Sequence, residues 1–111
     1  MLSKKHKLHL NRDFDKTFKA GRSQYGRFLG LRLKKNDLDY SRFGVILGLK
    51  VDKSAVGRHR LKRRIYGIIE KNYTKLPFPA DCVIIALPTL KEASFQETED
   101  ELLAMLNRLY K

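Results

Sequence analysis

The segment from Ser54 to Asn72 constrains this chain more than any other part of its sequence. At about 100° per residue, four aliphatic side chains fall on one side of a helix. They are Leu61, Ile65, Ile68 and Ile69. Four cations fall on the other side, namely Arg60, Arg63, Arg64 and Lys71. The segment therefore predicts a helix with an apolar face for a core and a cationic face for a polyanion.

The start of this helix carries a signal of its own. Ser54 is the expected N-cap, because its hydroxyl can accept a free N–H of the first turn. A helix start also attracts phosphate, since its free amides and the helix dipole point outward. Arg58 and Lys62 fall nearer the apolar side, so we expect them at the rim, where the helix overhangs its partner sheet.

The charge of the whole chain agrees with a polyanionic partner. The chain has 24 Lys plus Arg against 12 Asp plus Glu, a formal charge of +12. The excess of positive charge lies before residue 75, and the remaining third is mildly acidic. This distribution favours a nucleic acid over a membrane surface, and a basic protein that is merely soluble is the minority interpretation.

A length of 111 residues predicts a single domain, residues 1–111, with a modest core. Its one cysteine, Cys82, lies in an apolar run, which argues against a disulfide framework and fits a reducing compartment. No apolar run approaches the roughly 20 residues that span a bilayer. The basic start lacks the long apolar stretch of a secretory signal. We therefore expect a cytoplasmic protein with no membrane partner.

The chain begins with a basic lead, residues 1–9, which we expect to be extended and loosely held until it binds. A short helix should follow, with Asn11 as its cap, and run to about Ala20. Gly21 would end it as a left-handed residue.

Phe14 and Phe18 lie four residues apart and therefore project from one face of that helix. Spacing alone favours the core for both rings. The alternative is that they are partly exposed and stack on bases.

Residues 22–35 predict a strand, in which the stretch from Leu29 to Lys34 alternates apolar and polar or glycine. Its outward face holds Gly30, Arg32 and Lys34. Such a face is commonly a solvated surface, and it could also form one wall of an RNA groove, where glycine lets a backbone approach.

The remaining elements complete a mixed fold. Residues 36–41 predict a loop, and residues 42–50 a central strand antiparallel to the first. The basic helix and a buried strand at residues 81–87 then form a βαβ unit. A last helix begins at Ser94, whose capping box uses Glu97. Its apolar stripe consists of Phe95, Thr98, Leu102, Met105, Leu106 and Leu109. We predict an α/β (α+β) two-layer sandwich in the order α-β-β-α-β-α, with a possible extra short strand.

Catalytic motifs are missing from this pattern. His6, His9 and His59 have no metal-ligand spacing with one another or with Cys82. Neither a glycine-rich phosphate loop nor a carboxylate cluster for two metals occurs. His59 could serve as a general base, although a phosphate contact needs fewer assumptions. The residues thus predict an RNA- or DNA-binding domain without catalytic groups of its own, and no helix-turn-helix supports the DNA interpretation.

The order of elements and the basic helix resemble the protein subunit of bacterial ribonuclease P. The motif of that family has the form A-V-x-R-N-R-x-K-R, and residues 55–63 read AVGRHRLKR, with His59 in place of asparagine. Weaker matches are Phe14 and Phe18 closed by Gly21, the run Arg42-Phe43-Gly44, and the strand at residues 83–88. The resemblance covers nearly the whole chain.

Two departures stand out. The family has a Ser-Lys-Lys-x-Gly run before the helix, whereas Leu49–Lys53 keeps one lysine of it. Tyr66 occupies a position where the family often has arginine. The resemblance implies a ribosomal-protein-like fold with a left-handed βαβ crossover, against the general rule.

The resemblance also implies a function. The RNA subunit of the family performs the hydrolysis with bound Mg²⁺, and the protein assists it in removing the 5′ leader of precursor tRNA. Contacts to the catalytic RNA would come from Arg58, His59, Arg60, Lys62, Arg63 and Arg64. A cleft for the leader would be lined by Phe14, Phe18, Arg32, Lys34 and Lys50. The expected partners are the catalytic RNA and precursor tRNA, with no DNA. The alternatives are a ribosomal or ribosome-assembly protein and, last, a self-sufficient ribonuclease that uses His59.

Overall fold

A computed structural model describes residues 3–8 and 11–110 of the chain. The helices are α1 (Asn11–Ala20), α2 (Ala55–Asn72) and α3 (Phe95–Leu109). The strands are β1 (Arg22–Tyr25), β2 (Leu29–Lys35), β3 (Arg42–Ile46) and β4 (Ala80–Ala86). Short 3-10 turns are η1 (Lys4–His6), η2 (Tyr73–Lys75) and η3 (Pro88–Glu92). The predicted order of elements is confirmed, with β1 as the extra short strand.

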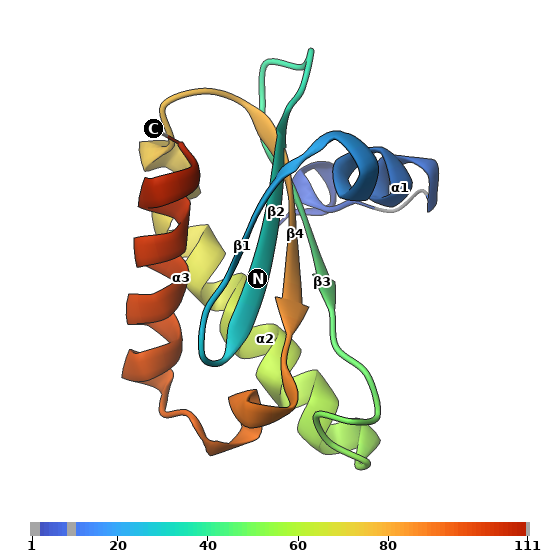
Figure 1. Cartoon of the computed structure of the whole chain (residues 1–111), viewed down its shortest axis with the longest axis vertical. Coiled ribbons are helices and arrows are strands. Elements are labelled where there is room, and N and C mark those ends of the chain that lie inside the picture. The colour runs from blue at the N-terminus through green and yellow to red at the C-terminus, as the bar shows by residue number, and fades with distance from the viewer. Residues whose placement is uncertain (1–2, 9–10, 111) are drawn as a thin grey trace.

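The four strands form one open sheet in the order β1-β2-β4-β3. Strand β2 pairs antiparallel with β1 and with β4, whereas β3 and β4 are parallel. Helices α2 and α3 cover one face of the sheet, and α1 lies against the upper part of the opposite face (Figure 1). None of the described helices lies over the lower part of that opposite face (Figure 1).

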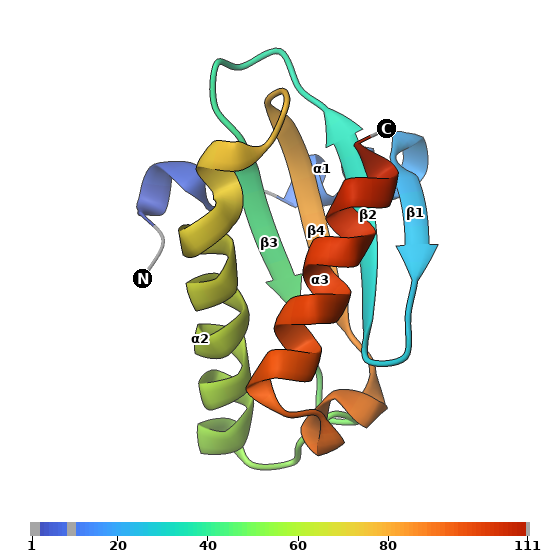
Figure 2. The same ribbon diagram turned by 90° about the vertical axis from the view of Figure 1, so that its left-hand side faces the viewer.

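The crossover from β3 through α2 to β4 is left-handed. In Figure 2 both strands run downward, β4 lies to the right of β3, and α2 is on the viewer's side of the sheet. Turned so that the strands point upward, β4 lies to the left of β3, whereas a right-handed connection would place it to the right. The handedness expected from the family resemblance is therefore confirmed.

The basic helix folds as its sequence predicts. All four aliphatic residues of its apolar face are buried, and Ile65 and Ile68 have no exposed surface. The Ser54 hydroxyl accepts the N–H of Gly57 at 3.2 Å, which confirms the predicted N-cap. Cys82 is fully buried on the same side of the sheet.

Helix α3 begins with the predicted capping box. The Ser94 hydroxyl accepts the N–H of Glu97 at 3.1 Å, and the Glu97 carboxylate accepts the N–H of Ser94 at 2.9 Å. Its apolar stripe is buried except for Phe95, which is 43% exposed, so the prediction fails for that residue. Phe95 is the first residue of the helix.

The prediction of one strand over residues 22–35 is wrong, because the segment folds as the β1–β2 hairpin. Gly26 donates its N–H to the carbonyl of Leu29 at 2.8 Å, and the turn breaks the strand. The carboxylate of Glu101 on α3 accepts the N–H groups of Phe28 and Leu29 at 2.8 and 2.9 Å, and also that of Arg27. A side chain from far along the chain thus satisfies the amides of the turn.

The prediction of a central strand over residues 42–50 is also wrong. Strand β3 ends at Ile46 and lies at the edge of the sheet, separated from β2 by β4. Its middle residues are nevertheless buried, because α2 and α3 cover Phe43 and Val45, while Leu8 and Phe14 lie over Gly44 on the other face. Burial on both faces therefore does not require a central position here.

Residues 3–8 of the basic lead make contacts with the folded domain that the sequence did not predict. Leu8 is buried and donates its N–H to the carbonyl of Phe43 at 2.8 Å, which fastens the lead to the edge of β3. The ring of His6 lies between Tyr40 and Tyr73, with centroid distances of 5.7 and 4.7 Å. His9 and the side chain of Asn11 lie outside the described residues, so the expectations for them stay predictions.

The prediction of a left-handed Gly21 is wrong, since this glycine has no positive φ. It donates its N–H to the carbonyl of Thr17 at 2.9 Å, as a residue at the end of a helix does. A side chain at Gly21 would collide with that carbonyl and with the backbone of Leu33. Glycine fits here because a Cβ atom would clash with the Thr17 carbonyl and would also be in tight contact with the backbone of β2.

Candidate RNA interface

The outer side of α2 presents free cations to solvent. Arg60, Lys62 and Arg63 are exposed, and within the described residues none of them has an ion pair or a hydrogen bond. His59 is exposed beside them. Unpaired cations along one helix face attract phosphate, and no rearrangement of the protein is needed to release them.

Two further arginines of the predicted set hold α2 in place. Arg58 is half-buried, and its Nη1 donates to the carbonyls of Asp52 and Lys53, each at 3.0 Å. Arg64 is also half-buried, with its Nη1 3.4 Å from the carbonyl of Ala93. These two side chains are therefore less available to RNA than the three exposed ones.

The start of α2 already holds an anion that belongs to the chain. The Asp52 carboxylate accepts the N–H of Ser54 at 2.9 Å and lies 3.7 Å from Nζ of Lys91. Its second oxygen occupies the space where a side chain at Gly57 would begin. The phosphate site predicted at this helix start is thus filled by Asp52.

A second surface lies on the opposite face of the sheet, where α1 meets β3. Phe14 is half-buried, and its ring fills the space above Gly44 that a side chain would otherwise take. Among the described side chains of α1, Thr17 is fully buried, and its hydroxyl donates to the carbonyl of Asp13 at 2.9 Å. The rings therefore flank the buried face of α1, and Phe14 is partly exposed, while its stacking on bases stays a prediction.

Phe18 occupies the same side of α1, one turn further along, and is half-buried as well. The Arg32 guanidinium lies 5.1 Å from the centroid of its ring, and Nη1 donates to the Phe18 carbonyl at 2.8 Å. Arg32 points outward from β2, as its alternation predicts. Phe14, Phe18 and Arg32 therefore lie together where α1 meets the sheet, at the place predicted for the leader cleft.

Of the other two residues predicted for this cleft, Lys34 lies on the same outward face of β2 as Arg32, and Lys50 lies elsewhere. Lys34 is half-buried on the outward face of β2, directly across from Asp81 on β4. Lys50 is exposed in the loop before α2, where it borders a hollow with Asp52 and Lys91. Lys50 therefore belongs to the surroundings of the α2 start and not to the cleft.

An ionic network anchors α1 to the sheet. Arg42 on β3 donates to Asp81 through Nε and Nη2, at 2.9 and 2.6 Å, and its Nη1 lies 3.3 Å from Asp13 on α1. The hydrogen bond to Asp81 raises the pKa of Arg42, which burial alone would lower. Sequence analysis missed this network, because its three members are separated by many residues and only Arg42 belongs to a motif.

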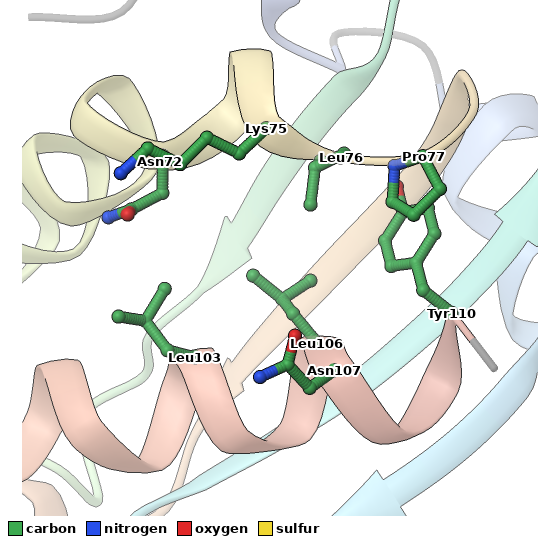
Figure 3. A pocket seen from close by; sticks show the side chains of 8 residues that line it. All are labelled: Asn72, Lys75, Leu76, Pro77, Leu103, Leu106, Asn107 and Tyr110. Carbon is green, nitrogen blue, oxygen red and sulfur yellow. The ribbon is translucent and has the colours of Figure 1, made fainter.

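The hollows of the described structure offer no catalytic constellation. One of about 420 Å³ lies between the end of α2 and α3, where Leu76, Leu103 and Leu106 form its walls and Asn72 and Asn107 its polar rim (Figure 3). Burial raises the pKa of Cys82 to about 12, so this thiol is not a nucleophile. No three His, Cys, Asp or Glu side chains of residues 3–8 and 11–110 are grouped to hold a metal.

Tyr66, where the family often has arginine, contributes to the core and not to the cationic surface. Its side chain is buried, and burial raises its pKa, while a backbone hydrogen bond with Val45 acts in the opposite direction. Lys7 of the basic lead lies 5.0 Å from its ring centroid.

None of the described helices is long and apolar enough to cross a membrane.

Together these features define a class: a small, strongly basic α+β domain that presents exposed cations of a helix on one side and partly exposed aromatic rings on the other, as RNA-binding proteins do. A family model described as Ribonuclease P matches residues 2–110. The ribonuclease P protein component of Alkaliphilus metalliredigens is 34% identical, over 94% of this chain and 93% of that protein. That of Thermotoga maritima is 33% identical, over 96% and 94%.

Solved structures agree with these relatives. The RNase P protein from Thermotoga maritima has a TM-score of 0.82 at 33% identity and covers 92% of this chain and 96% of that one. The Staphylococcus aureus RNase P protein has a TM-score of 0.84 over 96% and 98%, and at 22% identity it shows the fold alone. The chain belongs to the ribonuclease P protein family. Its function is that of the subunit that helps an RNA remove the 5′ leader during tRNA processing, and the catalysis is carried by that RNA.

Proposed function

We propose that the protein divides its work between two surfaces. The exposed cations of α2, centred on Arg60, Lys62 and Arg63, bind the catalytic RNA together with His59. The cleft of Phe14, Phe18 and Arg32 binds the single-stranded 5′ leader of precursor tRNA. The observation that carries the proposal is the placement of α2 and α1 on opposite faces of one sheet, so that two RNA segments can bind at once (Figure 1).

The cationic surface supplies affinity through charge. Each phosphate that it neutralises releases counterions, so affinity for the catalytic RNA should fall steeply with salt. Arg58 and Arg64 support this surface mainly by fixing α2, since their guanidinium groups already bind carbonyls of the chain. Lys50 can add a phosphate contact near the start of α2, where the exposed loop carries it.

The cleft supplies affinity through stacking. An aromatic face accepts any base, at about 1–3 kcal/mol per stacked base, so leaders of different sequence can be bound. Arg32 already stacks on Phe18 and adds a cation beside the ring. Lys34 lies one step further along the outward face of β2, where it can contact a backbone phosphate.

The chemistry belongs to the RNA in this proposal. The described residues do not provide a ligand set for Mg²⁺, so we assign the metal to the RNA subunit and derive no step of the protein through it. Precursor tRNA is the substrate, and the cytoplasm is the expected compartment, with which the free thiol of Cys82 agrees.

A cleavage assay tests this function. The catalytic RNA and precursor tRNA are mixed at a low Mg²⁺ concentration, with and without the protein, and the rate of leader removal is measured. We expect strong stimulation by the protein, and no cleavage by the protein freed of RNA. An absence of stimulation would contradict the proposal. Cleavage by the RNA-free protein, lost in His59→Ala, would instead establish a self-sufficient ribonuclease.

A further inference from the structure

The cleft continues into a bare apolar row across the lower part of the same sheet face. Tyr25 pairs with Gly30, Gly30 with Ile85, and Ile85 with Ile46, so these four positions lie side by side on β1, β2, β4 and β3. Tyr25 is 54% and Ile46 is 40% exposed, and Ile85 is half-buried. We call these four residues the Tyr25 row.

The ring of Tyr25 lies against Gly30 of β2. A side chain at Gly30 would begin within 2.5 to 2.7 Å of two ring carbons of Tyr25, so the ring occupies the space that glycine leaves empty. With one side against Gly30 and more than half of its surface exposed, the ring presents a free aromatic face. Glycine at position 30 therefore allows the ring of Tyr25 to pack against the sheet.

The Tyr25 row lies between the two surfaces of the proposed function. The neighbouring row, two residues further along β2, contains Arg32 and Gly44. Phe18 lies over Arg32, and Phe14 lies over Gly44. Two residues along a strand separate the rows, a distance of about 7 Å. In the other direction, β3 ends at Ile46 and the chain turns into the start of α2, at the lower end of the molecule in Figure 1.

We propose that Tyr25 is a second stacking platform for the leader, which receives a nucleotide on the cleavage-site side of those held by Phe14 and Phe18. The inference rests on the proposed function and extends it. An RNA strand that leaves the cleft toward the RNA bound at α2 must pass over this row. The row offers an aromatic face and two aliphatic side chains, which suit an unpaired base of any sequence.

The test is the affinity of the reconstituted holoenzyme for precursor tRNA whose leader extends past the cleft. Tyr25→Ala should weaken binding about 10-fold, within the range for loss of one stacked base, and Tyr25→Phe should restore it. Leu38→Ala, which removes another exposed apolar side chain outside the row, should have no effect. The melting temperature of Tyr25→Ala should stay close to that of the original protein, because the ring is largely exposed.

An abasic scan of the leader, made with the original protein and with Tyr25→Ala, locates the contact. One abasic position nearer the cleavage site should weaken binding to the original protein, and Tyr25→Ala should cause no additional loss at that position. Equal losses at every position, or an unchanged affinity of Tyr25→Ala, would overturn the inference. Phe14→Ala separates the two proposals: if it weakens binding while Tyr25→Ala does not, only the second platform fails, and if neither weakens binding, the leader cleft fails as well.

Discussion

The ring of Phe14 on α1 occupies the space that a side chain on Gly44 of β3 would fill. Helix α1 packs against the edge strand β3 at this point, because glycine has no side chain and leaves room for the ring. The floor of the cleft is therefore set by a glycine, and the position of the ring above it depends on that glycine.

Gly44→Ala should displace the ring of Phe14. The new methyl group would begin well inside contact distance of two ring carbons, so the ring must rotate or move away from the sheet. We expect a loss of stability of about 1–3 kcal/mol from overpacking, and a clear loss of leader affinity. Urea unfolding and titration of precursor tRNA measure the two effects. Unchanged leader affinity in a folded Gly44→Ala protein would show that the ring position is irrelevant to binding.

Arg42→Met should destabilise the protein through the carboxylates that it leaves behind. Asp81 and Asp13 have side chains only 10% and 12% exposed, and both would lose their cation. We expect a loss on the order of 3 kcal/mol in urea unfolding. The matched control is Lys71→Met, which breaks the more exposed pair with Glu99 and should cost less than about 1 kcal/mol. Similar losses in both variants would mean that Arg42 is an ordinary surface residue.

Cys82 should be unreactive in the folded protein. Burial raises its pKa to about 12, so the thiolate is scarce at neutral pH and reagents cannot reach it. A thiol-reactive dye should label the protein rapidly in denaturant and only at the rate of unfolding in buffer. Fast stoichiometric labelling of the native protein would place the thiol near the surface.

Glu97 should link stability to pH at the acidic end. Its hydrogen bonds with the backbone N–H and the hydroxyl of Ser94 lower its pKa from the ordinary value of 4.5. A lowered pKa means that the stabilisation is present above pH 4.5 and is lost as pH falls through the lower folded value.

The measurement for Glu97 is the difference in melting temperature between the original protein and Glu97→Gln. We expect this difference to shrink as the solution is acidified below the ordinary value, because the carboxylate then becomes protonated in both states. Glu92→Gln, at an exposed position without a hydrogen bond in the described residues, is the control. A gap for Glu97→Gln that does not depend on pH would show that the capping box is not carried by charge.

The sequence predicted those features of the fold that depend on residues close together in the chain. The apolar face of α2, the Ser54 cap and the capping box at Ser94 depend on residues within a few positions of each other, and all are confirmed. The β1–β2 turn depends on Glu101, more than seventy residues away, so no local pattern revealed it. The edge position of β3 was hidden for a similar reason, since Leu8 and the ring of Phe14 cover its outer face.

The sequence predicted the type of the candidate site, but it did not predict which contacts its residues make. The charge of Arg60, Lys62 and Arg63 is visible in the sequence, and the helical period predicts the exposure of Arg60 and Arg63, whereas it placed Lys62 nearer the apolar side. The pairing of Arg58 with carbonyls, the carboxylate of Asp52 at the helix start and the seat of Tyr25 on Gly30 arise from tertiary contacts. Alternation along β2 predicted the outward direction of Arg32 but not its stacking on Phe18.

The division of labour between the two surfaces is tested most directly by a crossed binding measurement. Affinities for the isolated catalytic RNA, and the dependence of precursor tRNA affinity on leader length, are measured for Arg60→Ala with Arg63→Ala and for Phe14→Ala. We predict that the double arginine variant loses affinity for the catalytic RNA and keeps its leader dependence, whereas Phe14→Ala keeps the former and loses the latter. Equal losses of both affinities in both variants would contradict two separate surfaces.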